Sequence, residues 1–165
     1  MDILAVFATI AGLSAWTGSS IFLTFFVEPV ISRKLGPGRA AEVMEFIHPR
    51  YYWLSFISGI VMLVGAGGAL FIPKVRVPSA TFMGLTAIAL TLSIYGWLVV
   101  YPRIVSLRTR LQSSAGSAEN FVVAERFDQA TRLAKFLNLV VLLILLGAAA
   151  ALAALVMAQD PPPGE

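Results

Sequence analysis

The residues most able to do chemistry in this chain are one histidine and one glutamate, each beside a long apolar run. His48 is the only histidine, and Met44 precedes it by four residues, so a helix would present a thioether and an imidazole on one face. Such a pair can hold a soft metal ion, and a single imidazole can also ligate a pigment or a haem at one axial position. A haem site with two histidine ligands from the same chain is excluded, because the chain supplies one.

The sequence around His48 is also typical of a helix that enters a membrane. The stretch FIHPRYYW, residues 46–53, joins a proline and an arginine to three consecutive aromatic residues, and such residues gather where helices cross the lipid headgroups. We therefore interpret His48 as an interfacial residue rather than a ligand, and we expect neither a metal site nor a cofactor. The expected interfacial anchors are Arg50, Tyr51, Tyr52, Trp53, Trp97, Tyr101 and Arg103.

Glu28 ends a polar stripe in the first apolar run. The stripe consists of Thr17, Ser20, Thr24 and Glu28. The spacings of three, four and four residues place these side chains on one helix face. One hypothesis is a polar track that leads a solute or a proton to the carboxylate. The other is hydrogen bonding between helices, with Glu28 paired to Arg50 or Arg103 and with the Trp16 N–H bonded to a neighbouring hydroxyl.

The chain that positions these residues has the composition of a membrane protein. Hydrophobic residues make up 58% and charged residues 13% of its 165 residues, which leaves too few charged groups to cover a soluble domain. No cysteine is present, which excludes disulfides, thiolate metal sites and cysteine nucleophiles. The net charge is +3, but the basic residues stand beside apolar runs. We therefore expect membrane lipids, and not nucleic acid, as partners.

Four apolar runs are long enough to cross a bilayer as helices, since about 20 residues at 1.5 Å per residue span the hydrocarbon core. The first has no basic residue before it and exceeds the apolar region of a signal peptide, so we expect it to be retained as a span. The expected spans are about 3–27, 51–72, 80–101 and 136–158, in a single domain of residues 1–158 followed by a disordered tail, 159–165.

The basic residues predict the orientation of the spans. Four lie between the first two spans and six between the last two, whereas Lys74 and Arg76 lie in the middle connection. By the positive-inside rule, the two basic segments face the cytoplasm and both termini face outside. We expect a multi-pass protein of the cell (inner) membrane.

The expected fold is an all-α, integral membrane four-helix bundle made of two tandem helical hairpins. The stretches FVEPVISRKL and VVYPRIVSLR each carry a proline after an apolar run and then a basic stretch, which fits either an internal repeat or two independent solutions at the interface. LGPG at 35–38 predicts a turn, and amphipathic cytoplasmic helix segments are expected over 39–47 and beyond a cap at Ser117. We expect the second segment to lie along the membrane surface before it enters the last span.

Several motifs resemble a known family. In the segment ERFDQATRLAKFLNLVVLLILL, residues 125–146, Phe127, Asn138 and the leucines match the family of small membrane proteins that includes transmembrane protein 205 (domain of unknown function 4149). Thr131 and Ala134 stand where that family tends to have His and Ser, which weakens any hydrophilic site there. The first half is similar in Trp16-Thr17-Gly18, Phe22, Pro29, Pro49 and Tyr51-Tyr52. The resemblance implies a four-span membrane protein and no particular activity.

The sequence shows no phosphate loop, nucleophile–base pair or metal cluster, so we do not expect an enzyme. The small residues in the spans favour close helix packing. The leading hypothesis is therefore a non-catalytic accessory or scaffold subunit, packed with other membrane subunits or with copies of itself. One alternative is a small transporter or permeability factor that uses the polar stripe. Another is a subunit that binds a cofactor or pigment through His48.

Overall fold

The structure, a computed structural model, describes residues 3–113 and 119–158. Every regular element in these residues is helical, and four helices are long and apolar enough to cross a membrane, which confirms the predicted all-α membrane bundle. The candidate spans are Ile3–Leu35, Glu42–Phe71, Pro73–Ser113 and Asn120–Met157. The predicted tail at 159–165 and the predicted cap at Ser117 lie outside the described residues.

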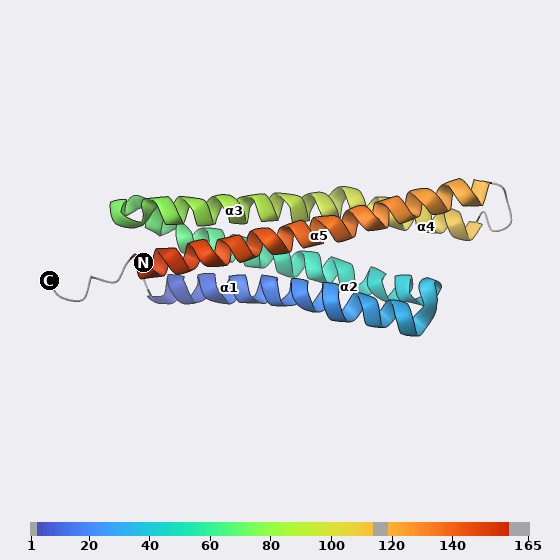
Figure 1. Cartoon of the computed structure of the whole chain (residues 1–165), viewed down its shortest axis with the longest axis horizontal. Helices are drawn as coiled ribbons and strands as arrows, with labels where there is room; N and C mark the ends of the chain where they lie inside the picture. Colours follow the sequence, from blue (N-terminus) through green and yellow to red (C-terminus); the bar gives the residue numbers. More distant parts are fainter. Residues whose placement is uncertain (1–2, 114–118, 159–165) are drawn as a thin grey trace.

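The first hairpin consists of α1 (Ile3–Ile21), the π-helical segment η1 (Phe22–Val27) and α2 (Glu28–Gly67). The ribbon of α2 reverses direction soon after it begins, and its longer part returns along α1 (Figure 1). Gly12 accordingly lies against Ser58, and Gly65 lies against Ala5. The midpoint of each pair along the sequence falls in LGPG at 35–38, where the sequence predicts a turn. The backbone stays helical through the reversal, so the short helix expected over 39–47 is part of α2.

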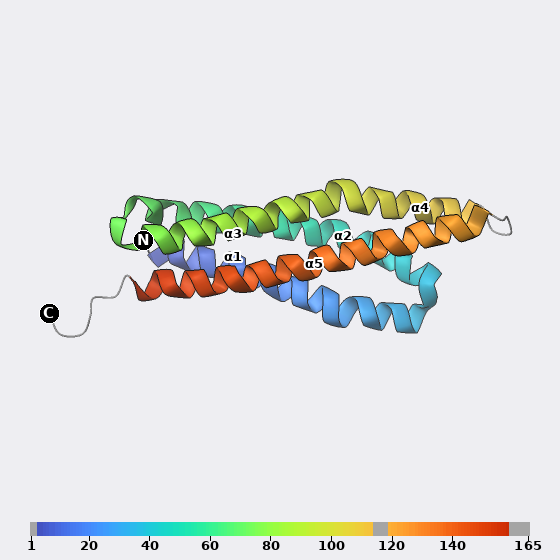
Figure 2. The same cartoon turned by 45° about the horizontal axis from the view of Figure 1, so that its top comes forward.

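The second hairpin follows two short 3-10 segments, η2 (Gly68–Phe71) and η3 (Pro73–Val75). It consists of α3, the π-helical segment η4, α4 and α5. Their bounds are Arg76–Tyr95, Gly96–Val100, Tyr101–Ser113 and Glu119–Met157. In both views α5 runs without a break beside α3 and then beside α4 (Figures 1 and 2).

The first part of α5 was expected to lie along the membrane surface, and this expectation is wrong. The segment continues along the bundle axis and packs against α4. The reason is its amphipathic face, which the sequence does predict. The side chains on one face are buried or half-buried, and those on the other are exposed. The covered residues are Val123, Phe127, Ala130, Ala134 and Leu137, and the exposed ones are Glu125, Asp128, Gln129 and Arg132. A protein surface, α4, covers the apolar face in place of lipid.

Each hairpin contains one wide helical turn directly before a proline. The backbone N–H of Glu28 bonds to the Leu23 carbonyl, and the N–H of Tyr101 bonds to the Gly96 carbonyl. Both bonds span five residues, one more than in an α-helix. The next residue in each case is a proline, whose ring crowds the carbonyl four residues earlier. The wider turn makes room for that ring. The equivalent placement adds a structural likeness to the sequence likeness between the hairpins.

The core of the bundle is formed by large side chains with no exposed surface. They are Trp16, Met62, Phe82, Leu145 and Leu155. Trp16 was expected to donate its indole N–H to a neighbouring hydroxyl. Within the described residues that N–H makes no hydrogen bond of ordinary geometry, although the Tyr51 hydroxyl lies close enough to interact with it. The hydroxyl of Ser20 is engaged elsewhere, because it donates to the Trp16 carbonyl oxygen at 2.8 Å.

The two ends of the bundle differ in charge. The start of α1 and the last turns of α5 lie at one end, and the reversal in α2 lies at the other with the facing ends of α4 and α5 (Figure 1). We call the second end, formed by residues 28–50, 101–113 and 119–135, the basic end. It carries all the Lys and Arg residues of the chain except Lys74 and Arg76. This grouping of the basic residues at one end agrees with the predicted hairpins. The side of the membrane that the basic end faces stays a prediction.

Candidate functional site

A cavity of about 290 Å³ lies at the basic end, between α2, α4 and α5. Its wall is largely apolar, with contributions from Met44, Ile104, Val105, Phe127 and Ala134. Because α2 belongs to the first hairpin and α4 and α5 belong to the second, neither hairpin forms the cavity alone. The volume is close to the lower limit for pockets that bind small molecules, about 300 Å³. The cavity therefore suits a small apolar or amphipathic molecule.

Glu28 and His48 meet on the wall of this cavity. The Nε2 atom of His48 lies 3.7 Å from a carboxylate oxygen of Glu28, and the two side chains are 24% and 16% exposed. Glu28 follows the wide turn of the first hairpin, and His48 comes from the returning part of α2. The structure thus brings together the two residues that the sequence singles out separately. It also places Pro49 inside α2.

The arginines expected to pair with Glu28 lie elsewhere. The guanidinium of Arg50 donates to the Phe46 carbonyl at 2.8 Å and lies 4.4 Å from the centre of the Phe46 ring. Arg103 lines a smaller hollow that is separate from the cavity. Both arginines are exposed at the surface of the bundle. The expected pairing of Glu28 with either residue is therefore wrong, and His48 takes that place.

Two aromatic rings pack beside the imidazole of His48. The Tyr101 ring lies edge-on at 5.8 Å between centroids, and the Tyr52 ring lies at 6.4 Å. Tyr52 in turn stacks on Trp97 at 6.4 Å. Tyr52 and its neighbour Tyr51 are buried, with 8% and 6% of their surfaces exposed. These two tyrosines were expected as anchors at the membrane interface, and they instead pack inside the bundle.

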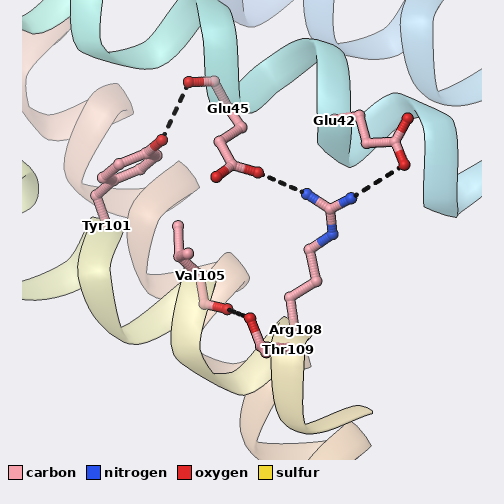
Figure 3. Close-up of polar contacts among 6 residues, drawn as sticks. All are labelled: Glu42, Glu45, Tyr101, Val105, Arg108 and Thr109. Atoms are coloured by element: carbon pink, nitrogen blue, oxygen red, sulfur yellow. Dashed lines mark hydrogen bonds and ion pairs between the residues drawn. The ribbon is translucent and has the colours of Figure 1, made fainter. Parts of the chain in front are cut away.

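Arg108 joins α4 to α2 at the edge of the cavity (Figure 3). Its guanidinium lies 3.0 Å from Glu45 and 3.8 Å from Glu42. The Tyr101 hydroxyl donates to the Glu45 backbone carbonyl at 3.1 Å. The Arg108 side chain is 15% exposed, whereas those of Glu42 and Glu45 are at least half exposed. Sequence reasoning missed Glu45 and Arg108, because no local spacing links residues that are 63 positions apart.

Residues of the 125–146 motif line the cavity from α5. The motif contributes four residues to the wall: Phe127, Thr131, Ala134 and Asn138. Their spacing of four, three and four places them on one helix face. The Thr131 hydroxyl donates to the Phe127 carbonyl at 2.9 Å, so its donor is already used within the helix. The motif therefore lies on the cavity wall, and this part of the wall is less polar than a histidine would make it.

Most of the polar stripe in the first span does not line the cavity. The Ser20 hydroxyl lies 2.9 Å from the Tyr51 hydroxyl, which is hydrogen bonding between helices. The Thr17 hydroxyl is buried and has no hydrogen-bond partner within the described residues, and Thr24 is half-buried. Of the stripe residues, Glu28 reaches the cavity. The stripe and the cavity therefore meet at this carboxylate.

Met44 and His48, considered from the sequence as soft ligands, both line the cavity. Over residues 3–113 and 119–158, no group of three or more His, Asp or Glu side chains is arranged to hold a metal ion. The arrangement that these ranges do show is an imidazole and a carboxylate on an apolar, aromatic wall. Such a wall fits the binding of a small molecule.

Comparisons with known proteins give one match. A family model described as "Domain of unknown function (DUF4149)" matches residues 11–113. The matched range contains Glu28, His48 and Tyr101, and it ends before the 125–146 motif on α5. No curated protein and no solved structure matches the chain.

Proposed function

The chain belongs to the DUF4149 family of unknown function, and from its cavity we propose that it is a small multi-pass membrane transporter or permeability factor. The solute binds in the cavity at the basic end. The observation that carries this proposal is the Glu28–His48 pair, 3.7 Å apart on a cavity wall built by both hairpins. Ionisable residues in membrane-spanning helices commonly mark solute, ion or proton pathways.

The position of the cavity supports the same function. Transporters built from two related halves place their solute sites where the halves meet, and broken helices help to shape those sites. Here the residue that follows the wide turn in each hairpin, Glu28 or Tyr101, lines the cavity. Wide turns of this kind occur frequently at functional sites. A solute bound there contacts both hairpins and can alter how they pack.

The proposal is tested by filling the cavity. Met44→Trp replaces a cavity-lining thioether with a larger indole, whereas Glu125→Gln changes an exposed carboxylate on α5 that lies outside the wall. Purified wild type and both variants are screened for thermal stabilisation by a panel of small amphipathic molecules, and each hit is then tested for uptake into liposomes. We expect hits that stabilise wild type and Glu125→Gln but not Met44→Trp. A panel in which every hit stabilises all three proteins equally excludes a solute site in this cavity.

We further propose that the basic end faces the cytoplasm and that both termini lie outside. The excess of Lys and Arg in the two segments that form the basic end supports this orientation, because positive residues flanking spans are retained on the cytoplasmic side.

An accessory or scaffold role is the second candidate, and two glycines favour it. A Cβ atom at Gly18 or Gly84 would meet nothing within 4 Å, so packing within the chain does not require glycine at either position. Small residues on open helix faces allow a helix of another chain to approach closely. The test is the mass of the protein extracted from its native membrane in mild detergent. Co-purifying chains at fixed stoichiometry support the role, and a stable monomer excludes it.

A further inference from the structure

We propose that the cavity at the basic end selects small lipophilic organic cations, that is, hydrophobic amines or quaternary ammonium ions. The inference rests on the proposed function, because it names the class of solute that the cavity binds. Three features of the wall carry it: one carboxylate without a permanent counter-charge, aromatic faces from three helices, and an apolar remainder.

The charges on the wall leave Glu28 as the carboxylate available to a ligand. The other acid, Glu45, is compensated by Arg108 at 3.0 Å. Glu28 faces His48, and an imidazole balances a carboxylate only when it is protonated. Lys135 also contributes to the wall, but its side chain is exposed, so its flexible stem allows the ammonium to stay in water. Because 16% of the Glu28 side chain is exposed, a bound cation compensates a largely desolvated charge.

Aromatic rings on the wall are the second feature that favours a cationic ligand. Tyr52, Tyr101 and Phe127 line the cavity from α2, α4 and α5 respectively. The rings of Tyr52 and Tyr101 are 6.4 Å apart and inclined at 65°, so they form a corner rather than a parallel stack. The faces of such rings attract cations, and aromatic cages of this kind recognise quaternary ammonium groups. Both rings line the same cavity as the Glu28 carboxylate.

The rest of the wall sets the other properties of the ligand. Met44, Ile104 and Val105 offer thioether and hydrocarbon surface, which favours an apolar body on the cation. The volume of about 290 Å³ restricts that body to a small molecule. The Glu28 carboxylate, which has no permanent counter-charge, disfavours an anion of the same shape. The predicted ligand is therefore compact, apolar and positively charged.

The test uses three probes of similar shape and different charge. They are benzyltrimethylammonium, its neutral carbon analogue neopentylbenzene, and the anion benzylsulfonate. Their binding to the purified full-length chain is measured by equilibrium dialysis. We expect the cation to bind roughly tenfold or more tightly than the neutral analogue, because only the cation gains a cation–aromatic contact and an ion pair. The anion should bind most weakly of the three.

Variants separate the two parts of the site. Glu28→Gln and Tyr101→Leu should each weaken binding of the cation by about tenfold and leave the neutral analogue unchanged. Glu125→Gln, the same chemical change on an exposed face, should bind like wild type. Tyr101→Phe keeps the ring and loses only the hydroxyl that donates to the Glu45 carbonyl, so it should bind the cation more tightly than Tyr101→Leu. If Glu28→Gln fails to fold, the comparison of Tyr101→Leu with Tyr101→Phe still tests whether the aromatic ring contributes to cation binding.

The outcomes distinguish this inference from the function on which it rests. If the neutral analogue or the anion binds best, and Met44→Trp abolishes that binding, the solute class is wrong and the cavity still binds a solute. If the cation binds equally to wild type, Glu28→Gln and Tyr101→Leu, the inference is also overturned. If Met44→Trp changes the binding of no probe, both the inference and the solute site in the cavity are refuted.

Discussion

The hydroxyl oxygens of Ser20 and Tyr51 lie 2.9 Å apart and join α1 to α2 inside the first hairpin. Because the Ser20 hydroxyl donates to the Trp16 carbonyl at 2.8 Å, the Tyr51 hydroxyl is the donor between the two side chains. Tyr51 is followed by Tyr52, which lines the cavity. The bond therefore holds the helix that carries His48 and Tyr52 in register with α1.

Removing this bond should destabilise the hairpin measurably. Tyr51→Phe deletes the donor and keeps the ring, and we expect a loss of about 0.6 kcal/mol, with an upper limit near 1.7 kcal/mol for a bond between membrane helices. The measurement is reversible unfolding in mixed micelles. A double-mutant cycle with Ser20→Ala isolates the pairwise contribution. A coupling energy near zero would show that the two hydroxyls do not depend on each other.

Close approach of α1 and α2 should make one glycine sensitive to substitution. A Cβ atom at Gly65 would overlap the Thr9 hydroxyl and lie 3.0 Å from the Ala5 carbonyl oxygen. Gly65→Ala should therefore cost about 1–3 kcal/mol, the usual range for overpacking. Gly67→Ala is the matched control, because a Cβ there meets nothing within 4 Å. Equal stability of the two variants in a thermal denaturation assay would contradict this packing.

Breaking the ion pair between Arg108 and Glu45 should strengthen cation binding. Arg108→Met removes the positive charge 3.0 Å from Glu45 and leaves a second uncompensated carboxylate on the cavity wall. We expect the affinity for benzyltrimethylammonium to rise roughly fivefold, since two charges 4 Å apart interact by about 1 kcal/mol in water-like surroundings. Arg76→Met, at the opposite end of the bundle, is the control. An unchanged or weaker affinity in Arg108→Met would show that Glu45 does not act on the ligand.

The proposed orientation can be tested without altering the native basic residues. The chain has no cysteine, so a single introduced cysteine reports its own position. Ser113→Cys lies at the basic end and Ile72→Cys at the other, and both positions are exposed. In intact cells, a membrane-impermeant maleimide should label Ile72→Cys and not Ser113→Cys, and lysis should make both reactive. The reverse pattern would place the basic end outside.

The sequence predicts the spans and their grouping because hydrophobic length and charge act locally. Each apolar run is long enough by itself, and LGPG marks the reversal between the first two spans. The covered face of α5, with Phe127 and Ala134, is also readable, since a regular helix repeats every 3.6 residues. The sequence does not predict what covers that face, because a surface that faces lipid and a surface that packs on α4 have the same apolar pattern. Tertiary packing decides between the two.

The cavity depends on information that local patterns do not contain. Glu28 and His48 lie on opposite sides of the reversal in α2, and Glu45 and Arg108 come from different hairpins. Pairing such residues requires the rotation of each helix about its own axis. The wide turns alter that rotation, and only the proline that follows each of them hints at their presence. For the same reason, Arg50 and Arg103 are plausible partners of Glu28 from sequence but lie elsewhere in the structure.

The wide turns have a consequence for how this chain tolerates changes in length. A π-helical turn is what one extra residue leaves in an α-helix, and each residue rotates the helix by about 100°. Deleting any one residue of Phe22–Val27 would restore the ordinary spacing and turn Glu28 away from the face on which α1 packs. Every cavity residue would still be present, yet Glu28 and His48 would no longer meet. The site is thus encoded by residue counts as well as residue identities, so single-residue insertions and deletions can abolish it without substituting any of its members.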